Sequence, residues 1–183
     1  MIRSRLRSSA QPVRHWRVVV AMGLSACAVL AGAGVASASV ASASVAPITG
    51  PIYGQGGTCL DDRAFGTANG NPVQVYKCNE GSNQQWTVTN PQFGATTTIT
   101  IYGMCLDVHG GFSFNGDPVT LWGCNGTGAQ QWIPESNGTL VNPNSGKCLD
   151  DTAWGGSGTA LEIWGCNSGE NQVWEISGLP ISG

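Results

Sequence analysis

The sequence predicts an all-β fold built from three copies of one four-stranded unit. The order Cys-Leu-Asp, an aromatic residue two positions before Cys-Asn, and Gln-x-Trp occurs three times, and the first Cys recurs after 46 and then 43 residues. No stretch beyond the N-terminal segment shows a convincing 3.6-residue apolar period, whereas short alternating runs between Gly-rich turns are typical of strands. A fixed period of this size indicates one supersecondary unit used three times, closing into a barrel of about twelve strands.

Residues 1–43 are expected to be a cleaved secretory signal peptide. A basic start precedes an uncharged apolar run at 18–35, and Ala36-Ser37-Ala38 and Ala41-Ser42-Ala43 both match a small-x-small cleavage site. An uncleaved membrane anchor is the alternative, and it is disfavoured because small residues dominate the run. We therefore expect a secreted, extracellular protein with a lead-in at 44–51 and one domain at 52–183.

Charge and metal-ligand content narrow the possible partners. After residue 43 the chain has three basic and eleven acidic side chains, which gives a net charge of −8. A domain this acidic, without a basic stripe, is not expected to bind nucleic acid or an anionic membrane surface. Because Cys-x-x-Cys is missing and His109 is the one histidine after the signal, neither a metal nor another cofactor is expected. We expect a monomer.

Six cysteines follow the predicted signal, two in each copy, and an exported chain of this kind is expected to form disulfides. Sequence alone allows about fifteen pairings of six cysteines. If all copies fold in the same way, the two cysteines of each copy must meet in the same way. A disulfide that closes a loop of this length stabilises the fold by roughly 3 kcal/mol in the chain-entropy model. The repeat therefore favours Cys59–Cys78, Cys105–Cys124 and Cys148–Cys166.

The copies are expected to span about 52–93, 94–137 and 138–177. In the first, strands are predicted at 51–53, around Leu60, at 73–76 and at 84–88, with a turn-rich loop at 62–71. The second has alternating runs at 97–101, 119–122 and 131–133, and the third at 139–141, 161–164 and 173–176. One copy alone cannot bury its apolar face, but three copies around an axis can.

These motifs, three times in register with three cysteine pairs, resemble the ricin-type β-trefoil lectin family, whose members include carbohydrate-binding modules of secreted bacterial glycosidases. The resemblance covers Ile52 to about Ser177. It implies a β-trefoil of three pseudo-symmetric repeats and carbohydrate as the partner. In that family the sugar contacts lie at the Asp of Cys-x-Asp, the aromatic residue two before the second Cys, and the Asn before Gln-x-Trp. The Gln of that motif and the residue four before the second Cys support them.

Carried over to this chain, the resemblance implies three candidate sites. The first comprises Asp61, Gln74, Tyr76, Asn83 and Gln84, with Asn79 close by. The third comprises Asp150, Glu162, Trp164, Asn171 and Gln172, and here a carboxylate replaces the Gln of the first site. The second comprises Asp107, Thr120, Trp122 and Gln130, with Ala129 in place of the amide.

These residue types suit a pyranose, which has an apolar face of C–H groups and a rim of hydroxyls. A flat aromatic ring packs against the face, a carboxylate accepts from two neighbouring hydroxyls, and an amide both donates and accepts. Because a lost bond that leaves its partner unpaired costs roughly 1–3 kcal/mol, we expect the first site to bind best, the third to bind, and the second to be weak or silent.

Structural roles compete with these functional ones. The three tryptophans of Gln-x-Trp and the three leucines of Cys-Leu-Asp are expected in the core, at Trp86, Trp132, Trp174, Leu60, Leu106 and Leu149. The three site aspartates could instead cap turns, and Tyr76, Trp122 and Trp164 could simply cover the barrel. Asp62 and Asp151 are expected to be solvated, and His109 to lie in a loop without a catalytic role. Trp154, in a Gly-rich loop, is expected to be exposed and could widen the third site.

The sequence thus predicts a secreted lectin that recognises galactose- or xylose-type sugars or polysaccharides through up to three shallow sites. It is not expected to be an enzyme, because its acidic residues are spread one set per copy and no nucleophile or metalloprotease motif occurs. The alternatives are a β-trefoil that binds proteins, as a protease inhibitor or toxin-like partner, a glycosidase with this fold, or a non-catalytic subunit of a glycosidase.

Overall fold

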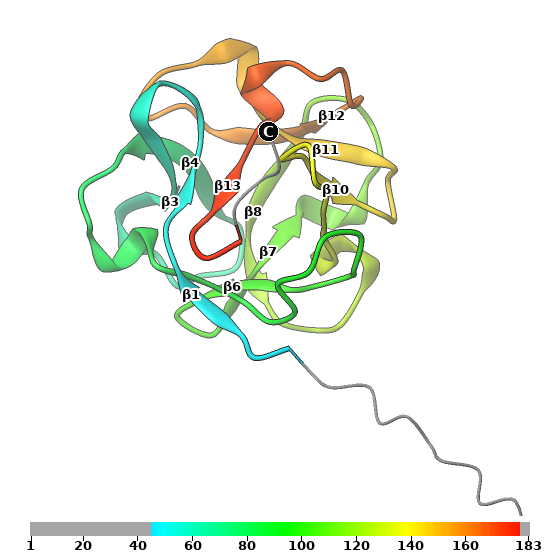
Figure 1. The fold of residues 1–183 in the computed structure, drawn as a ribbon, viewed down its shortest axis with the longest axis horizontal. Helices are drawn as coiled ribbons and strands as arrows, with labels where there is room; N and C mark the ends of the chain where they lie inside the picture. Colours follow the sequence, from blue (N-terminus) through cyan, green and yellow to red (C-terminus); the bar gives the residue numbers. More distant parts are fainter. Residues whose placement is uncertain (1–44, 180–183) are drawn as a thin grey trace, which may run out of the picture. The chain divides into compact units, whose positions relative to one another are not determined.

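Thirteen antiparallel strands and seven short 3₁₀ helices make up residues 45–179, the part of the chain that the computed structural model describes (Figure 1). The predicted signal peptide lies outside these residues. No helix of the described part is long and apolar enough to cross a membrane. The strands are β1 (Ile48–Gly50), β2 (Ile52–Tyr53), β3 (Thr58–Asp62), β4 (Asn71–Lys77), β5 (Trp86–Val88), β6 (Ile99–Ile101), β7 (Met104–Val108), β8 (Asp117–Gly123), β9 (Ile133–Pro134), β10 (Leu140–Asn142), β11 (Lys147–Asp151), β12 (Leu161–Trp164) and β13 (Glu175–Ile176). The 3₁₀ helices are η1 (Gln55–Gly57), η2 (Arg63–Phe65), η3 (Ser82–Gln84), η4 (His109–Gly111), η5 (Gly128–Gln130), η6 (Thr152–Trp154) and η7 (Glu170–Gln172).

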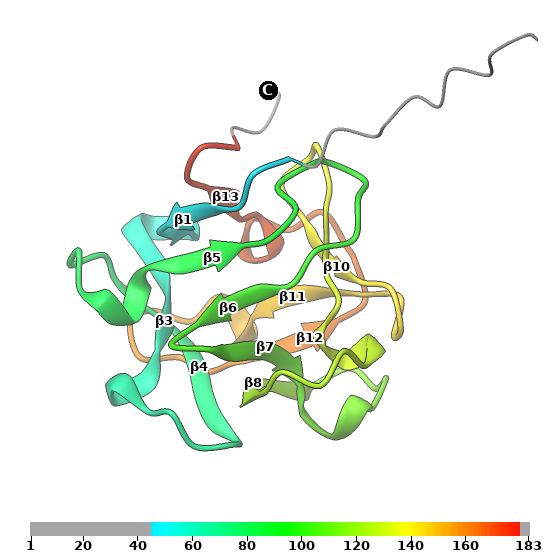
Figure 2. The same cartoon turned by 90° about the horizontal axis from the view of Figure 1, so that it is seen from below.

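The strand pairing repeats three times and closes on itself. Each repeat has a central hairpin, β3–β4, β7–β8 or β11–β12. The last strand of each repeat pairs with the first strand of the next, as β5–β6, β9–β10 and β13–β2. Figure 2 shows β1 beside β5, followed by β6, β7 and β8 in the order in which they pair. The predicted all-β fold, a β-trefoil, is confirmed.

The hairpins also meet one another. β8 pairs with β4 at Thr120 and Leu121 and with β12 at Asp117 and Pro118, and an isolated bridge between Gln74 and Ala160 joins β4 to the residue before β12. A loop of the third repeat is hydrogen bonded to β4 beside this bridge, because Gly158 donates to the Val75 carbonyl at 2.7 Å. The three hairpins therefore form a closed ring with no free inner edge.

Three equivalent tryptophans and leucines fill the centre, as predicted. Trp86, Trp132 and Trp174 are at most 2% exposed. Each indole N–H donates to the carbonyl of the leucine in its own Cys-Leu-Asp, at 2.8 Å for Leu60 and at 3.0 Å in the other two repeats. Because a buried indole needs a partner for its N–H, this bond fixes the ring orientation and ties each repeat's last strand to its hairpin. The core also contains Leu106 and Leu149, both fully buried.

The predicted disulfides form within the repeats, as Cys59–Cys78, Cys105–Cys124 and Cys148–Cys166. All three have a Cα–Cα distance of 5.1 Å. Each bridge joins the start of the hairpin's first strand to the segment that follows its second strand, and so holds that segment beside the site aspartate.

The predicted last strands begin too early. The Gln of each Gln-x-Trp ends a 3₁₀ helix and the strand starts two or three residues later, so that β5 begins at Trp86 rather than at 84, β9 at Ile133 rather than at 131, and β13 at Glu175 rather than at 173. The turn is needed because it brings the Gln side chain back to the hairpin, where its hydrogen bonds lie.

Asp62 and Asp151 are buried, so the expectation that they are solvated is wrong. They are 0% and 1% exposed, and Val108, equally buried, takes the same place in the second repeat. Each lies two residues after the core leucine of its strand and therefore on the same face. Asn71 donates to Asp62, and Gln55 donates to Asp151 at 3.1 Å, while the second carboxylate oxygen of each has no hydrogen-bond partner within residues 45–179.

Burial raises the pKa of Asp62 to about 6, with the neighbouring Asp61 charge acting in the same direction and the Asn71 hydrogen bond opposing both. An unfolded Asp titrates near 4, so the folded protein holds the extra proton between about pH 4 and 6. This group therefore adds stability as the pH falls through that window and costs stability at neutral pH.

We expect Asp62→Asn to raise the free energy of unfolding by up to about 2 kcal/mol at pH 7, because it removes a buried charge, and by much less at pH 4. Denaturant unfolding of both proteins from pH 4 to pH 8 measures the difference. Glu175→Gln, at an exposed position of β13, is the control and should leave the pH profile unchanged. A gap between wild type and Asp62→Asn that stays constant with pH would contradict this assignment.

Candidate functional site

A buried carboxylate held by three amides lies in the first repeat. Asp61, on β3, is 1% exposed. One of its oxygens accepts from Gln74 at 2.9 Å, and the other accepts from Asn83 at 2.9 Å and from Gln84 at 2.8 Å. Gln74 lies opposite Asp61 in the β3–β4 register, whereas Asn83 and Gln84 come from η3. The sequence-predicted polar residues of this repeat are therefore brought together around one carboxylate.

The Gln of each Gln-x-Trp motif holds the site together and lies behind it. Gln84, Gln130 and Gln172 are at most 1% exposed. In each repeat the amide N–H groups go to the site aspartate and to a backbone carbonyl, and the amide oxygen accepts the backbone N–H of the Asn that follows the second Cys. With these bonds made, the side chain orients the aspartate and is placed to support a ligand rather than to touch it.

Asn83 and Asn171 are also committed to the protein. Asn83 Nδ2 donates to Asp61 and to the Asp62 carbonyl, and Asn171 Nδ2 makes the same two bonds to Asp150 and Asp151. Their amide oxygens are buried and have no hydrogen-bond partner in the described part of the chain. These two residues line the cavities with their N–H groups already committed, so a free donor must come from another side chain.

An aromatic ring stands in the wall of an open cavity in each repeat. Tyr76 and Trp164 are 42% and 41% exposed, and Trp122 is half-buried. Each ring lies two residues beyond the partner of the site aspartate on the hairpin, and therefore on the same face. The cavities have volumes of about 430 Å³ at Asp61, 420 Å³ at Asp107 and 490 Å³ at Asp150. In all three repeats the aromatic ring and the site aspartate line the same cavity, and their role in sugar binding stays a prediction.

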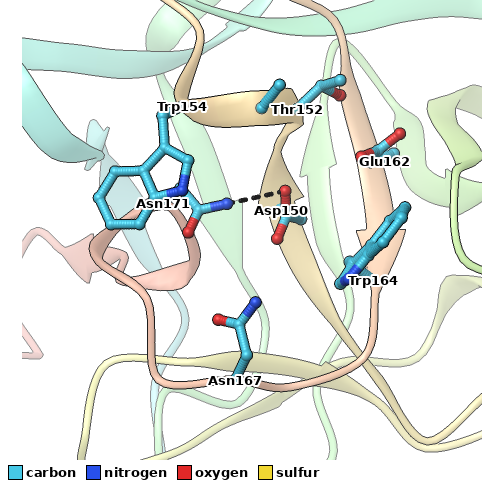
Figure 3. Close-up of a pocket in the computed structure, with 8 residues that line it drawn as sticks. Asp150, Thr152, Trp154, Glu162, Trp164, Asn167 and Asn171 are labelled. Atoms are coloured by element: carbon cyan, nitrogen blue, oxygen red, sulfur yellow. Dashed lines mark hydrogen bonds between the residues drawn. The ribbon is translucent and has the colours of Figure 1, made fainter.

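The third site has aromatic rings on two sides. Figure 3 shows Trp154 and Trp164 on opposite sides of the Asp150 carboxylate, with Glu162 beside Trp164 on the same strand. Asn167 lies below, and its amide nitrogen points into the space between the rings. The Asn167 oxygen already accepts the Gly169 N–H at 2.8 Å, which fixes the amide in this orientation. Asn167 therefore offers the free donor that Asn171 does not.

The third site also holds two neighbouring carboxylates, because Glu162 lies opposite Asp150 in the β11–β12 register. Burial raises the pKa of Glu162, and the Asp150 charge raises it further. Burial also raises the pKa of Asp150, against the hydrogen bonds from Gln172 and Asn171. Where the first site has the donor Gln74, the third has a second acceptor, so the two sites differ in the hydrogen bonds they offer.

The second site is also an open cavity, but its polar side chains differ from those of the other two sites. Asp107 accepts one side-chain bond, from Gln130 at 2.9 Å, because Ala129 and Thr120 provide no amide. Thr120 Oγ1 is buried without a hydrogen-bond partner among residues 45–179. His109 lines this cavity and packs edge-on against Trp122, with ring centroids 5.9 Å apart. Asn144 reaches in from the third repeat, close to Gly128. The weakness of the second site, predicted from the missing amide at Ala129, stays a prediction.

Several residues that line the cavities were not predicted from the sequence. Asn79 was noted only as a neighbour, and Asn125 and Asn167 were given no role, although the Cys-Asn pair repeats three times. The 3₁₀ helices that follow the aspartates contribute Arg63, Phe65, His109 and Trp154 to the cavities. Only Trp154 had been expected near a site. The available signal was the exposed aromatic residue four positions after the site aspartate in the first and third repeats.

Comparison with known proteins places these features in a family. The model of the ricin-type β-trefoil lectin domain matches residues 48–174. Serine protease 1 of Rarobacter faecitabidus is 41% identical over 126 residues, which cover 69% of this chain and 23% of that protein. The chain therefore spans about a quarter of the length of the curated relative that it matches.

Two solved structures share the fold. The designed threefold-symmetric protein ThreeFoil matches with a TM-score of 0.64 and 26% identity, over 69% of this chain and 95% of that chain. A non-toxic homologue of type II RIPs from Momordica charantia, solved in complex with α-methyl-D-galactoside, matches with a TM-score of 0.63 and 30% identity, over 73% of this chain and 48% of that chain. The buried aspartate with its amides, the exposed ring and the threefold barrel are thus accounted for together: the chain belongs to the ricin-type β-trefoil lectin family, whose domains bind carbohydrate.

Proposed function

We propose that this protein is a secreted lectin that recognises galactose- or xylose-type sugars in glycans or polysaccharides. The first and third sites bind, the second contributes weakly, and the domain has no catalytic activity. It acts as a monomer and binds neither nucleic acid nor membrane once the signal peptide is removed.

The observation that carries this proposal is a fixed carboxylate beneath an exposed aromatic ring, in a cavity open to solvent. Amide donors hold the aspartate before any ligand arrives, so little side-chain freedom is lost on binding. The ring at Tyr76 or Trp164 suits the apolar face of a sugar, and the hydroxyl rim meets the carboxylate and the amide of Asn79 or Asn167. A cavity of 400–500 Å³ lies in the usual range for small-ligand sites.

The choice of sugar and of compartment has separate support. The relative from Momordica charantia was solved with α-methyl-D-galactoside, and it is 30% identical to this chain. For export, support comes from the apolar N-terminal run with its two cleavage patterns and from three disulfides, which form and persist in oxidising compartments.

The distribution of carboxylates favours binding over hydrolysis. Glycoside hydrolysis takes two carboxylates placed on either side of one bond. The first and second cavities are each lined by one carboxylate, and in the third Asp150 and Glu162 lie side by side on neighbouring strands. Incubating the protein with aryl galactosides, aryl xylosides and xylan tests this directly, and release of product would contradict the proposal.

Removing one ring should remove one site. We expect Tyr76→Ala and Trp164→Ala each to lower the number of sugars bound, and the double variant to lose binding by at least about tenfold, because the stacking surface is gone. Isothermal titration with galactose- and xylose-containing glycans measures both quantities. Neither ring is part of the buried core, so the unfolding temperature should change by no more than about 2 °C.

Tyr102→Ala is the matched control, since Tyr102 is equally exposed and lies outside the cavities described above. Its binding should equal that of the unchanged protein. No response of the unchanged protein to any galactose- or xylose-containing glycan would count against the proposed function.

The carboxylate pair of the third site gives a pH-dependent prediction. In Glu162→Gln, the new amide can donate to Asp150 as Gln74 does to Asp61, so we expect the free energy of unfolding to rise by about 1 kcal/mol at pH 7. Because the pKa of Glu162 is raised in the folded state, the wild-type protein regains stability as the pH falls and the gap should shrink toward pH 4. Thermal unfolding at pH 4, 5.5 and 7 checks this. A variant less stable than wild type at pH 7 would contradict the assigned repulsion.

A further inference from the structure

Two consecutive left-handed residues follow the site aspartate in every repeat. The second repeat has Gly110 and Gly111 there, with φ of 68° and 66°. The first and third repeats instead have an alanine and an aromatic residue. Phe65 has a φ of 58° and Trp154 a φ of 59°. The same backbone turn is therefore made with glycine in one repeat and with a bulky ring in two.

The turn itself does not require an aromatic residue, because glycine makes it in the second repeat. The left-handed region disfavours residues with a β-carbon, and glycine adopts it without a steric penalty. Phe65 and Trp154 are 58% and 56% exposed, so more than half of each side chain stays accessible to solvent and to a ligand. Local backbone strain at an exposed residue is typical of functional sites.

Trp154 lies between two cavities. On one side it lines the third site together with Asp150 and Trp164. It also lines a neighbouring cavity of about 670 Å³, whose other walls are the turn at 55–58, Lys77 and the loop at 155–157. A ligand that fills both cavities must cross the indole.

Hydrogen bonds between the third and first repeats fix the walls of the neighbouring cavity relative to each other. Ser157 Oγ accepts the Lys77 backbone N–H at 3.0 Å, and Gly158 donates to the Val75 carbonyl at 2.7 Å. On the facing side, Thr58 Oγ1 donates to the Gln55 carbonyl at 2.7 Å. The cavity thus lies at the junction of the two repeats and is lined by Lys77 and by the polar side chains of Gln55, Thr58 and Ser157.

We propose that the third site binds a linear oligosaccharide of at least two units, with one sugar over Asp150 against Trp164 and the next crossing Trp154 into the neighbouring cavity. This inference rests on the proposed carbohydrate-binding function and adds the size of the ligand. Trp154 is a binding residue for the second unit, and the left-handed turn is retained because it holds the indole between the cavities.

The test compares a monosaccharide with a linear tetrasaccharide of xylose or of galactose, whichever the protein binds. All variants carry Tyr76→Ala, so that the third site dominates the signal. Before any further change, the tetrasaccharide should bind at least about fivefold more tightly than the monosaccharide. Trp154→Gly should weaken the tetrasaccharide about three- to tenfold, the range expected for one aromatic contact, and the monosaccharide by less than about twofold.

The same variant separates a binding role from a structural one. Glycine suits the left-handed turn, so the unfolding temperature of Trp154→Gly should be unchanged or higher while binding weakens. Trp154→Asn, which also tolerates this conformation, should behave alike, and Trp154→Tyr should retain most of the tetrasaccharide preference. Phe114→Ala, at a ring that is 72% exposed and outside the cavities described, is the matched control and should change nothing.

Four results would overturn the inference. The first is equal affinity for the two ligands in the starting protein. The second and third are that Trp154→Gly weakens the binding of both ligands equally, or weakens the binding of neither. The fourth is a fall in the unfolding temperature of both Trp154→Gly and Trp154→Asn. Failure of the proposed function is distinguishable, because the unchanged protein would then bind neither ligand and Trp164→Ala would have no effect on either.

Discussion

The hydrogen bond from a buried glutamine to a buried aspartate is the interaction on which each repeat depends. It joins the short 3₁₀ helix before the core tryptophan to the first strand of the hairpin, at 2.7–2.9 Å in all three repeats. The same glutamine accepts a backbone N–H beyond the second Cys, next to the disulfide. A buried charge is tolerated only with such partners, so the group that a sugar would meet is also the group that orders the repeat.

The three repeats share this hydrogen bond and differ in the residues that line the cavity beside it. All retain the glutamine, the aspartate, the disulfide and the core tryptophan, which are the parts that the barrel needs. The variable positions are the hairpin partner of the aspartate, which is Gln74, Thr120 or Glu162, and the turn after it, with Phe65, Gly111 or Trp154. Threefold symmetry therefore constrains the scaffold, while the surface of each cavity is free to diverge.

The sequence was sufficient for the fold because the repeated residues are those that the core requires. Cysteine pairing and the buried tryptophans and leucines follow from one pattern read three times, whereas the meeting of Asp61 with its amides was implied by the resemblance to the family. The boundary of the last strand in each repeat did not follow, because the glutamine's role depends on hydrogen bonds to a distant segment. Asp62 was misjudged as a charged residue near a loop, although its spacing from Leu60 put it on the core face. The contribution of Phe65 was missed for another reason: the aromatic residue four positions after the aspartate occurs in two of the three repeats, and the sequence does not show the left-handed backbone that turns its ring toward the cavity.

The closed ring of hairpins places one cavity in each third of the barrel, so the cavities open in different directions around its axis. A single stiff chain lying along one side cannot reach all of them. If the proposed sites bind sugar, pockets that diverge in this way would hold separate chains and cross-link them, so that a solution of soluble polymer would become turbid near equivalence and clear again in excess protein. A higher apparent affinity through two sites bound at once would then require a branched or densely clustered glycan, whose sugars are spaced by about the width of the barrel.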